Sequence, residues 1–275
     1  MHAPNTWKRL DADALARARA LLSPWERIVD PVFSGLENIP DERPILFVGN
    51  HTLFGALDVP LMFFKLLDDM DIHLRVLIDR LHGRVPLWRT MVERFGGVEG
   101  TPENCDQLMQ SGECILVFPG GAREVAKRRG EQYKLVWGDR AGFARHALRN
   151  GCTIVPFAAI GAEDMFNIVA DADSYLTSKV GGLLKRFGVR EDVLIPLAIP
   201  KALNAQTLER FYFHFMPPIH MPPTEATQGD DFEDMAWMLR EQTRESVEMG
   251  LEYLLDARQN DPLRKIPTRE QIAAK

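Results

Sequence analysis

Short apolar runs, each closed by turn residues, alternate along the chain with segments in which apolar residues recur at helical spacing. Apolar runs of this length are typical of buried strands. We expect strands at residues 45–48, 74–78, 114–118, 153–157 and 211–215. We expect helices at residues 11–22, 59–69, 103–111, 139–150 and 231–258.

This alternation predicts the α/β class, with a central, mostly parallel β-sheet flanked by helices. Pro24 is expected to end the N-terminal helix, because proline interrupts the hydrogen bonds of a helix interior. Asn150 and Gly151 are typical of a helix end directly before the strand at 153–157. The charged amphipathic segment at 231–258 adds a C-terminal helix.

The composition is that of an ordinary globular protein, with 275 residues, 45% of them hydrophobic and 26% charged. The formal net charge of −6 argues against a general nucleic-acid surface, and we expect no nucleic-acid partner. Cys105, Cys114 and Cys152 form no Cys-x-x-Cys pair, so neither a disulfide framework nor a cysteine zinc site is predicted. The histidines show no metal-ligand spacing, and we expect no metal.

Membrane-spanning and secreted proteins are also disfavoured by the sequence. The longest apolar stretch, residues 53–67, contains Asp58, Pro60 and Lys65. It is shorter than the roughly 20 residues that cross a bilayer. The first residues lack the apolar core and the small-residue cleavage site of a signal peptide. We therefore expect a cytoplasmic protein, either dissolved or lying on a membrane surface.

The first motif with chemical potential is Gly49-Asn50-His51, directly after an apolar strand. In open α/β sheets, ligands gather at the carboxyl ends of strands. A histidine there is a candidate general base near neutral pH, and Asp58 is the nearest carboxylate in sequence that would orient it. Alternatively, Asp58 is the N-cap of the helix that begins near Pro60, and His51 is a polar residue at a strand end.

A second motif joins an apolar strand to two glycines and a basic segment. It reads Phe118-Pro119-Gly120-Gly121-Ala122-Arg123-Glu124. Glycines let a backbone approach a ligand closely, and N–H groups at a helix start hold anions. The basic residues that follow suit a phosphate-bearing ligand such as coenzyme A, or an anionic lipid headgroup. The alternative is a tight turn followed by a solvated basic loop.

In this order along the chain, the two motifs resemble those of the glycerolipid acyltransferase superfamily, Asn-His-x-x-x-x-Asp and then Phe-Pro-Glu-Gly-Thr-Arg-Ser. The form Phe-Pro-Gly-Gly-x-Arg-Glu, with the later Tyr133-Lys134-Leu135, looks like one branch of it. That branch holds the diacylglycerol- and monoacylglycerol-acyltransferase-like proteins and the plant phytyl ester synthases. The resemblance suggests an N-terminal helical segment at 1–40, an acyltransferase domain at 41–223, and a C-terminal helix and tail at 224–275.

Two positions depart from the superfamily motifs. The standard place of the aspartate after the histidine is Ala56, and Asp58 lies further on. The glutamate after Phe-Pro is Gly120 here. In members of the superfamily that acylate glycerol phosphate, the Phe-Pro-Glu-Gly motif helps to hold that substrate. The glycine at position 120 therefore implies, by the resemblance, a neutral and more apolar acceptor alcohol.

The resemblance implies transfer of a fatty acyl group to the hydroxyl of a lipid alcohol or glycerolipid. An acyl-CoA or acyl carrier protein thioester would be the co-substrate, and no cofactor is expected. His51 would be the catalytic general base and Asp58 its orienting carboxylate. The substrate-binding residues would be the other members of the two motifs, Asn50, Phe118, Pro119, Gly120, Gly121, Arg123 and Glu124.

The same resemblance implies a cytoplasmic enzyme, peripheral on the inner face of a membrane. Residues 177–190 place basic side chains around an apolar stripe, which suits an interfacial helix on anionic lipid. A core-facing helix with solvated lysines is the alternative there. Two other functions stay open: an acyl-CoA thioesterase at the same site, and a non-catalytic, membrane-associated lipid-binding protein.

Overall fold

The computed structural model describes residues 11–52, 57–78, 95–170, 197–200, 208–222 and 231–265. The elements in chain order are α1 (Ala12–Val29), β1 (Val32–Ser34), η1 (Leu36–Asn38), β2 (Ile45–Gly49), α2 (Val59–Met70), β3 (Leu74–Ile78), β4 (Gly97–Glu99), α4 (Pro102–Gln110), β5 (Cys114–Val117), α5 (Gly121–Val125), α6 (Gly142–Asn150), β6 (Thr153–Ile160), η3 (Ala162–Met165), β7 (Phe166–Ala170), β8 (Leu197–Pro200), β9 (Tyr212–Phe215) and α9 (Phe232–Asn260).

A seven-stranded sheet forms the centre of the molecule, in the order β1-β9-β6-β2-β5-β3-β4. Only the β6–β9 pair of this sheet is antiparallel, and its other neighbours run parallel. β2 lies between β6 and β5 and is buried along its whole length, as expected for a strand of near-continuous apolar sequence. The predicted α/β class with a central, mostly parallel sheet is therefore confirmed. β7 and β8 form a separate antiparallel pair.

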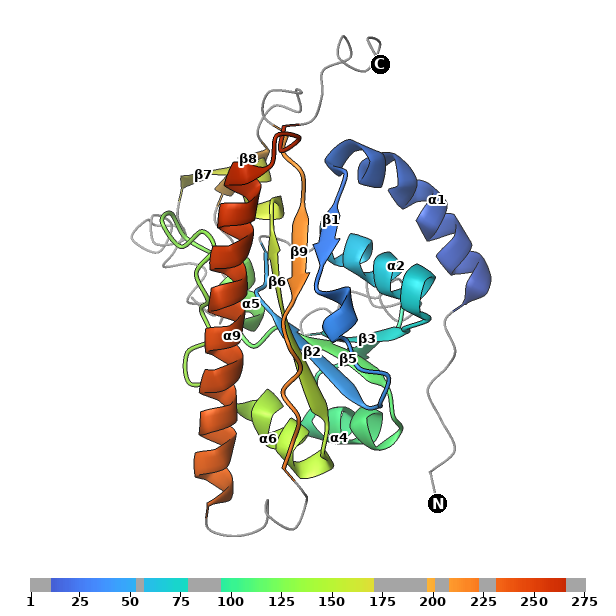
Figure 1. Ribbon diagram of the computed structural model, residues 1–275, viewed down its shortest axis with the longest axis vertical. Coiled ribbons are helices and arrows are strands. Elements are labelled where there is room, and N and C mark those ends of the chain that lie inside the picture. The colour runs from blue at the N-terminus through green and yellow to red at the C-terminus, as the bar shows by residue number, and fades with distance from the viewer. Residues whose placement is uncertain are drawn as a thin grey trace, which may run out of the picture.

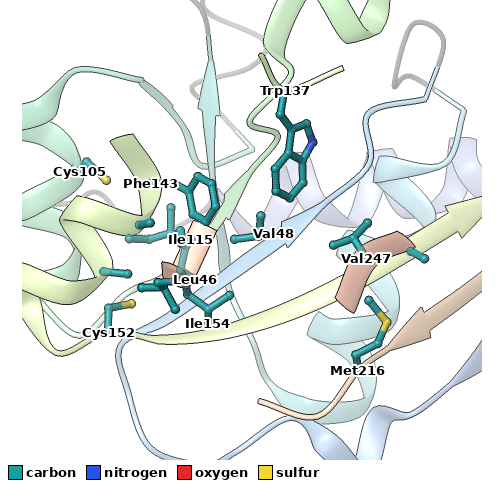
Figure 2. Packing of buried hydrophobic residues seen from close by; sticks show 14 of the residues in the cluster. Leu46, Val48, Cys105, Ile115, Trp137, Phe143, Cys152, Ile154, Met216 and Val247 are labelled. Atoms are coloured by element: carbon teal, nitrogen blue, oxygen red, sulfur yellow. The ribbon is translucent and has the colours of Figure 1, made fainter. Parts of the chain in front are cut away.

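Helices cover both faces of the sheet (Figure 1). On one face, α1 and α2 enclose a cluster that includes Phe47 and Phe157. On the other face, α4, α6 and α9 enclose a second cluster around Leu46, Val48 and Trp137. Figure 2 shows this second cluster, with Val247 of α9 beside Met216. None of the described helices is both long and apolar enough to cross a membrane.

α9 lies directly against β6 along the sheet (Figure 1). At Gly250 of this helix a Cβ atom would lie 2.5 Å from Sδ of Met216 and 3.0 Å from Cβ of Ala158. A glycine at this point lets the helix pack flat on the strand. Val247 and Leu251 of the same helix face are buried in the core.

The predicted end of the N-terminal helix near residue 22 is wrong, because α1 continues through Pro24 to Val29. Trp25, the next residue, packs edge-on against Phe211, with 5.8 Å between ring centroids. Its indole N–H also donates to the carbonyl of Leu57 at 2.9 Å. These contacts hold the turn after the proline and outweigh the backbone hydrogen bond that Pro24 cannot make.

The other predicted elements are present, with ends that differ from the expectation by at most three residues. The short strands β1 and β4 were not predicted, since three residues are too few to show an alternation. The division of the chain at residues 40 and 223 stays a prediction. In the structure, β1 pairs with β9 and α9 lies on β6, so all three proposed segments contribute to the sheet and its cores.

Candidate active site

The two sequence motifs follow neighbouring parallel strands. β2 pairs with β5 on one side, with Val48 opposite Val117, and with β6 on the other, with Gly49 opposite Phe157. The carboxyl ends of these strands therefore lie at the same edge of the sheet, where ligands of α/β proteins bind. At Gly49 a Cβ atom would lie 2.4 Å from the ring of Phe157, so glycine is required for this ring to pack beneath the site.

Asn50 extends the pairing of β2 with β6 by means of its side chain. Its amide nitrogen donates to the carbonyl of Ala159 at 2.9 Å, and its amide oxygen accepts from the N–H of Ala159 at 2.8 Å. The residue is buried, and it fixes the main chain immediately before His51. A contact of Asn50 with substrate stays a prediction.

His51 is half-buried, and main-chain and aromatic atoms surround its ring. Nδ1 lies 2.9 Å from the carbonyl oxygen of Thr52. Because a carbonyl oxygen only accepts hydrogen bonds, Nδ1 is the donor, and the lone pair of the neutral ring is on Nε2. The ring centroid lies 4.3 Å from that of Phe118, which packs edge-on against Phe157. The structure thus brings residues of both motifs into contact.

Asp58 is the N-cap of α2, as one of the two sequence interpretations expected. Its Oδ1 accepts from the N–H of Val59 at 2.8 Å. Burial raises the pKa of Asp58, while the nearby Thr52 side chain, the hydrogen bond from the Val59 N–H and the charge of Lys127 act to lower it. Thr52 therefore lies between the two predicted catalytic residues. Orientation of His51 by Asp58 stays a prediction.

A tight turn links β5 to α5. The N–H of Gly121 donates to the carbonyl of Phe118 at 3.0 Å, and Gly121 adopts a φ of +50°, which favours glycine. Arg140 donates to the carbonyls of Pro119, at 3.2 Å, and Gly120. α5 has only five residues, so the expected anion site at its start stays a prediction.

Arg123, the first basic residue after the turn, is paired with Glu131 of the same segment. Arg123 donates to Glu131 through both terminal nitrogens, at 2.9 and 2.5 Å. Partial burial acts to raise the pKa of Glu131, but hydrogen bonds from Arg123 and the N–H of Arg128 outweigh it, and the pKa is lowered. Arg123 must exchange this partner before it binds a phosphate. Its predicted role in substrate binding stays a prediction.

Beneath the turn lies a buried cluster of two carboxyls and one amine, Glu124, Lys127 and Glu163. Nζ of Lys127 lies 2.5 Å from Glu163 Oε1 and 3.9 Å from Glu124 Oε1. Burial raises the pKa of Glu124 to about 7 and also raises that of Glu163. Lys127 is one of the basic residues that follow the second motif, and Glu163 lies in neither motif. A charged residue three positions after the end of the long apolar strand β6 was the available signal for Glu163.

Glu124 itself is fully buried in this cluster, so its predicted contact with substrate stays untested. The described residues contain no group of three His, Cys, Asp or Glu side chains that could hold a metal ion. The segment 177–190, predicted to contact lipid, and Ala56, the standard aspartate position, lie outside the described residues.

Comparisons with known proteins place these motifs in a family. A family model described as Acyltransferase matches residues 30–160, which include both motifs. The chain is also 31% identical over 262 residues to phytyl ester synthase 1, chloroplastic, of Arabidopsis thaliana. These matches support a glycerolipid acyltransferase-like family for the chain. The alignment covers 86% of this acyltransferase-like chain and 36% of the plant protein, so the chain spans about a third of the length of that relative.

A second relative is the DGAT1/2-independent enzyme synthesizing storage lipids of Bos taurus. It is 34% identical over 126 residues, which is 44% of this acyltransferase-like chain and 36% of the bovine protein. Among solved structures, the crystal structure of the 1-acyl-sn-glycerophosphate (LPA) acyltransferase PlsC from Thermotoga maritima aligns with a TM-score of 0.47 and 15% sequence identity. That alignment covers 85% of this chain and 81% of the bacterial one.

Proposed function

We propose that the chain is an O-acyltransferase that transfers a fatty acyl group from acyl-CoA, or from an acyl carrier protein thioester, to the hydroxyl of a lipid alcohol or glycerolipid. The observation that carries the proposal is the state of His51. Its Nδ1 donates to the Thr52 carbonyl, which leaves Nε2 as the basic nitrogen at the carboxyl edge of the sheet. The match of residues 30–160 to the Acyltransferase family model supports acyl transfer as the reaction.

In this mechanism, Nε2 of His51 accepts the proton of the acceptor hydroxyl as that oxygen attacks the thioester carbonyl carbon. The tetrahedral intermediate then collapses, the C–S bond breaks, and the departing thiolate takes the proton back from the imidazolium. The products are an ester and a free thiol. Since the acceptor attacks directly, the reaction needs no acyl-enzyme intermediate.

Asp58 would support His51 through Thr52, which lies next to both. The Thr52 carbonyl holds Nδ1 of the imidazole, and its side chain contributes to the pKa of Asp58. A carboxylate at this place would also stabilise the imidazolium that forms during the reaction. The proposal therefore gives Asp58 two roles, the cap of α2 and a positioning role for the base.

The acceptor is proposed to be a neutral lipid alcohol. Gly120 presents no side chain to a phosphate, and the guanidinium of Arg123 is hydrogen-bonded to Glu131. Release of Arg123 from Glu131 would make it available to a phosphate of the thioester donor. We also propose that the protein acts at the surface of a membrane, on its inner face, with residues 177–190 as the contacting segment.

The test is free-thiol release from palmitoyl-CoA against a panel of long-chain alcohols, mono- and diacylglycerol and a lysophospholipid. We expect a neutral alcohol to stimulate release by wild type, and His51→Ala to lower it by roughly 100-fold or more. Asp58→Asn keeps an oxygen for the cap but loses the charge, and we expect release to fall about tenfold with little change in Tm.

His146→Ala is the matched control, because His146 is a partly buried histidine on α6, outside both motifs, whose Nδ1 lies 2.7 Å from Oδ1 of Asp106. We expect this variant to keep wild-type thiol release. Release that does not depend on alcohol but needs His51 would identify a thioesterase instead. Equal release by wild type and His51→Ala would exclude His51 as the base. Vesicle binding without thiol release from any donor would support the lipid-binding alternative.

A further inference from the structure

Gly120 is a glycine for a reason other than backbone conformation. Its φ of −66° and ψ of −24° lie in the right-handed helical region, which every residue adopts. A Cβ atom at this position, however, would lie 2.0 Å from Oε2 and 2.4 Å from Cβ of Glu124. The side chain of Glu124 therefore occupies the space in which any side chain at position 120 would begin.

The carboxyl of Glu124 reaches this space by folding back from α5 towards the end of β2. It is fully buried, and the backbone N–H groups of His51 and Val136 face it closely enough to lower its pKa. Lys127 supplies a positive charge 3.9 Å away and is held from its other side by Glu163. Neither oxygen of Glu124 makes a hydrogen bond of ordinary geometry.

A fully buried carboxyl without ordinary hydrogen bonds is costly for the fold. Here it lies against the main chain of the residue proposed as the general base, and three neighbours arrange it: Gly120 makes the room, Lys127 supplies charge, and Glu163 fixes Lys127. A group of this kind is expected where it serves a site rather than stability.

We propose that Glu124 is a positioning residue for His51, that it holds the main chain at the end of β2 from within the core, and that position 120 is glycine in order to admit it. Glu124 acts through His51 and does not touch the substrate. The inference rests on the proposed role of His51 as the base, and it replaces the substrate contact expected for Glu124 from the sequence.

The experiment is a double-mutant cycle between positions 120 and 124. Glu124→Ala removes the carboxyl, Gly120→Asp places a second side chain in occupied space, and the double variant Gly120→Asp/Glu124→Ala returns one carboxyl to the same space. We expect each single variant to lower kcat about tenfold or more with KM for palmitoyl-CoA within about twofold, and the double variant to recover most of kcat.

A second readout does not depend on activity. The pKa of the His51 imidazole is followed by NMR with ring-labelled histidine, in the variants above and in the near-isosteric Glu124→Gln, which keeps the shape of the side chain. Glu124 carries its negative charge in the range around and above its pKa of about 7. Because that charge favours the imidazolium, removal of the carboxyl is expected to lower the pKa of His51. The double variant should restore it.

Glu113→Gln is the matched control. Glu113 is also a buried carboxyl paired with a cation, Arg75 at 2.9 Å. It directly precedes β5 and so lies at the amino end of that strand, whereas the candidate site lies at the carboxyl ends. It should leave kcat and the His51 signal unchanged.

The proposal is overturned if Glu124→Gln leaves both kcat and the pKa of His51 as in wild type. It is also overturned if the double variant is no better than Glu124→Ala. If wild type transfers no acyl group, the proposed function fails. In that case, the pKa of the His51 imidazole, measured by NMR in the same variants, decides whether Glu124 positions His51.

Discussion

At the scale of single residues, the position of His51 is set mainly by main-chain atoms. The amide of Asn50 pairs with the backbone of Ala159, and the carbonyl of Thr52 holds Nδ1 of the imidazole. Sequence reasoning found His51 because a histidine after an apolar strand is conspicuous. The hydrogen bond from Nδ1 to the Thr52 carbonyl could not be predicted in this way, since backbone partners leave no trace in the residue types.

The buried charges next to the site could not have been found in the same way. Lys127 lies in a run of basic residues, and such a run predicts a solvated surface, whereas Lys127 is 2% exposed. Burial of this kind depends on how β5, α5 and the end of β6 meet. The sequence did carry one clue, since position 120 holds glycine where the related motif holds glutamate, and Glu124 now fills that place.

Glu124 makes a pH-dependent contribution to stability whose sign follows from its raised pKa. The folded pKa is about 7, above the ordinary value of 4.5, so the folded state holds the proton more tightly. The stabilisation is complete below about pH 4.5 and is lost as the pH rises to 7, by at most about 3 kcal/mol. The free energy of unfolding of Glu124→Gln relative to wild type should therefore increase from pH 5 to pH 8.

Urea unfolding at four pH values between 5 and 8 measures this difference. Glu131→Gln is a control of opposite sign, because the pKa of Glu131 is lowered and its titration lies below this range. Its difference from wild type should stay constant from pH 5 to 8. A constant difference for Glu124→Gln as well would show that the carboxyl is not held protonated by burial.

At the scale of elements, periodicity located the long helices and strands, and tertiary contacts decided their ends. α6 begins at Gly142, three residues after the predicted start, and α1 continues through a proline because Trp25 packs beyond it. β7 and β8 follow no clear alternation and were not predicted. Helix propensity treats every glycine alike, whereas the surroundings of each helical glycine differ.

Two helical glycines should therefore respond to alanine with opposite sign. At Gly142 a Cβ atom meets nothing within 4 Å, so Gly142→Ala should stabilise the protein by about 0.5–1 kcal/mol. At Gly250 the Cβ atom would lie 3.0 Å from that of Ala158, so Gly250→Ala should destabilise it by about 1–3 kcal/mol. Thermal unfolding of both variants gives the test, and shifts of Tm in the same direction would contradict the packing of α9.

At the scale of the whole molecule, the family match ends at residue 160, at the last residue of β6, but the fold does not. β9 pairs with β6 on the far side from β2, and residues of α9 belong to one of the two clusters. The sequence predicted both β9 and α9, but it placed the helix in a separate C-terminal segment, residues 224–275. Packing across the sheet, which no local pattern encodes, joins it to the core.

A chain shortened to residues 1–222 should consequently lose cooperative unfolding and bind the dye ANS. The reason is that removal of α9 exposes the core residues against which Val247 and Leu251 pack. Val247→Asp should act in the same direction in the full chain. Met249→Asp is the matched control, since this side chain is 62% exposed on the same helix. A shortened chain with a sharp unfolding transition would show that α9 is dispensable to the core.

Among the strands that the structure describes, β1 and β4 are the outermost of the seven-stranded sheet, and each has three residues. At about 3.3 Å per residue, each edge offers only about 10 Å of backbone to a foreign strand. Long, flat edges recruit other chains into sheets and start aggregation. The long strands β2 and β6 lie in the interior, out of reach of such pairing. Short outer strands protect a sheet protein against self-association. They leave the carboxyl ends of the central strands, where the candidate site lies, free to bind a ligand.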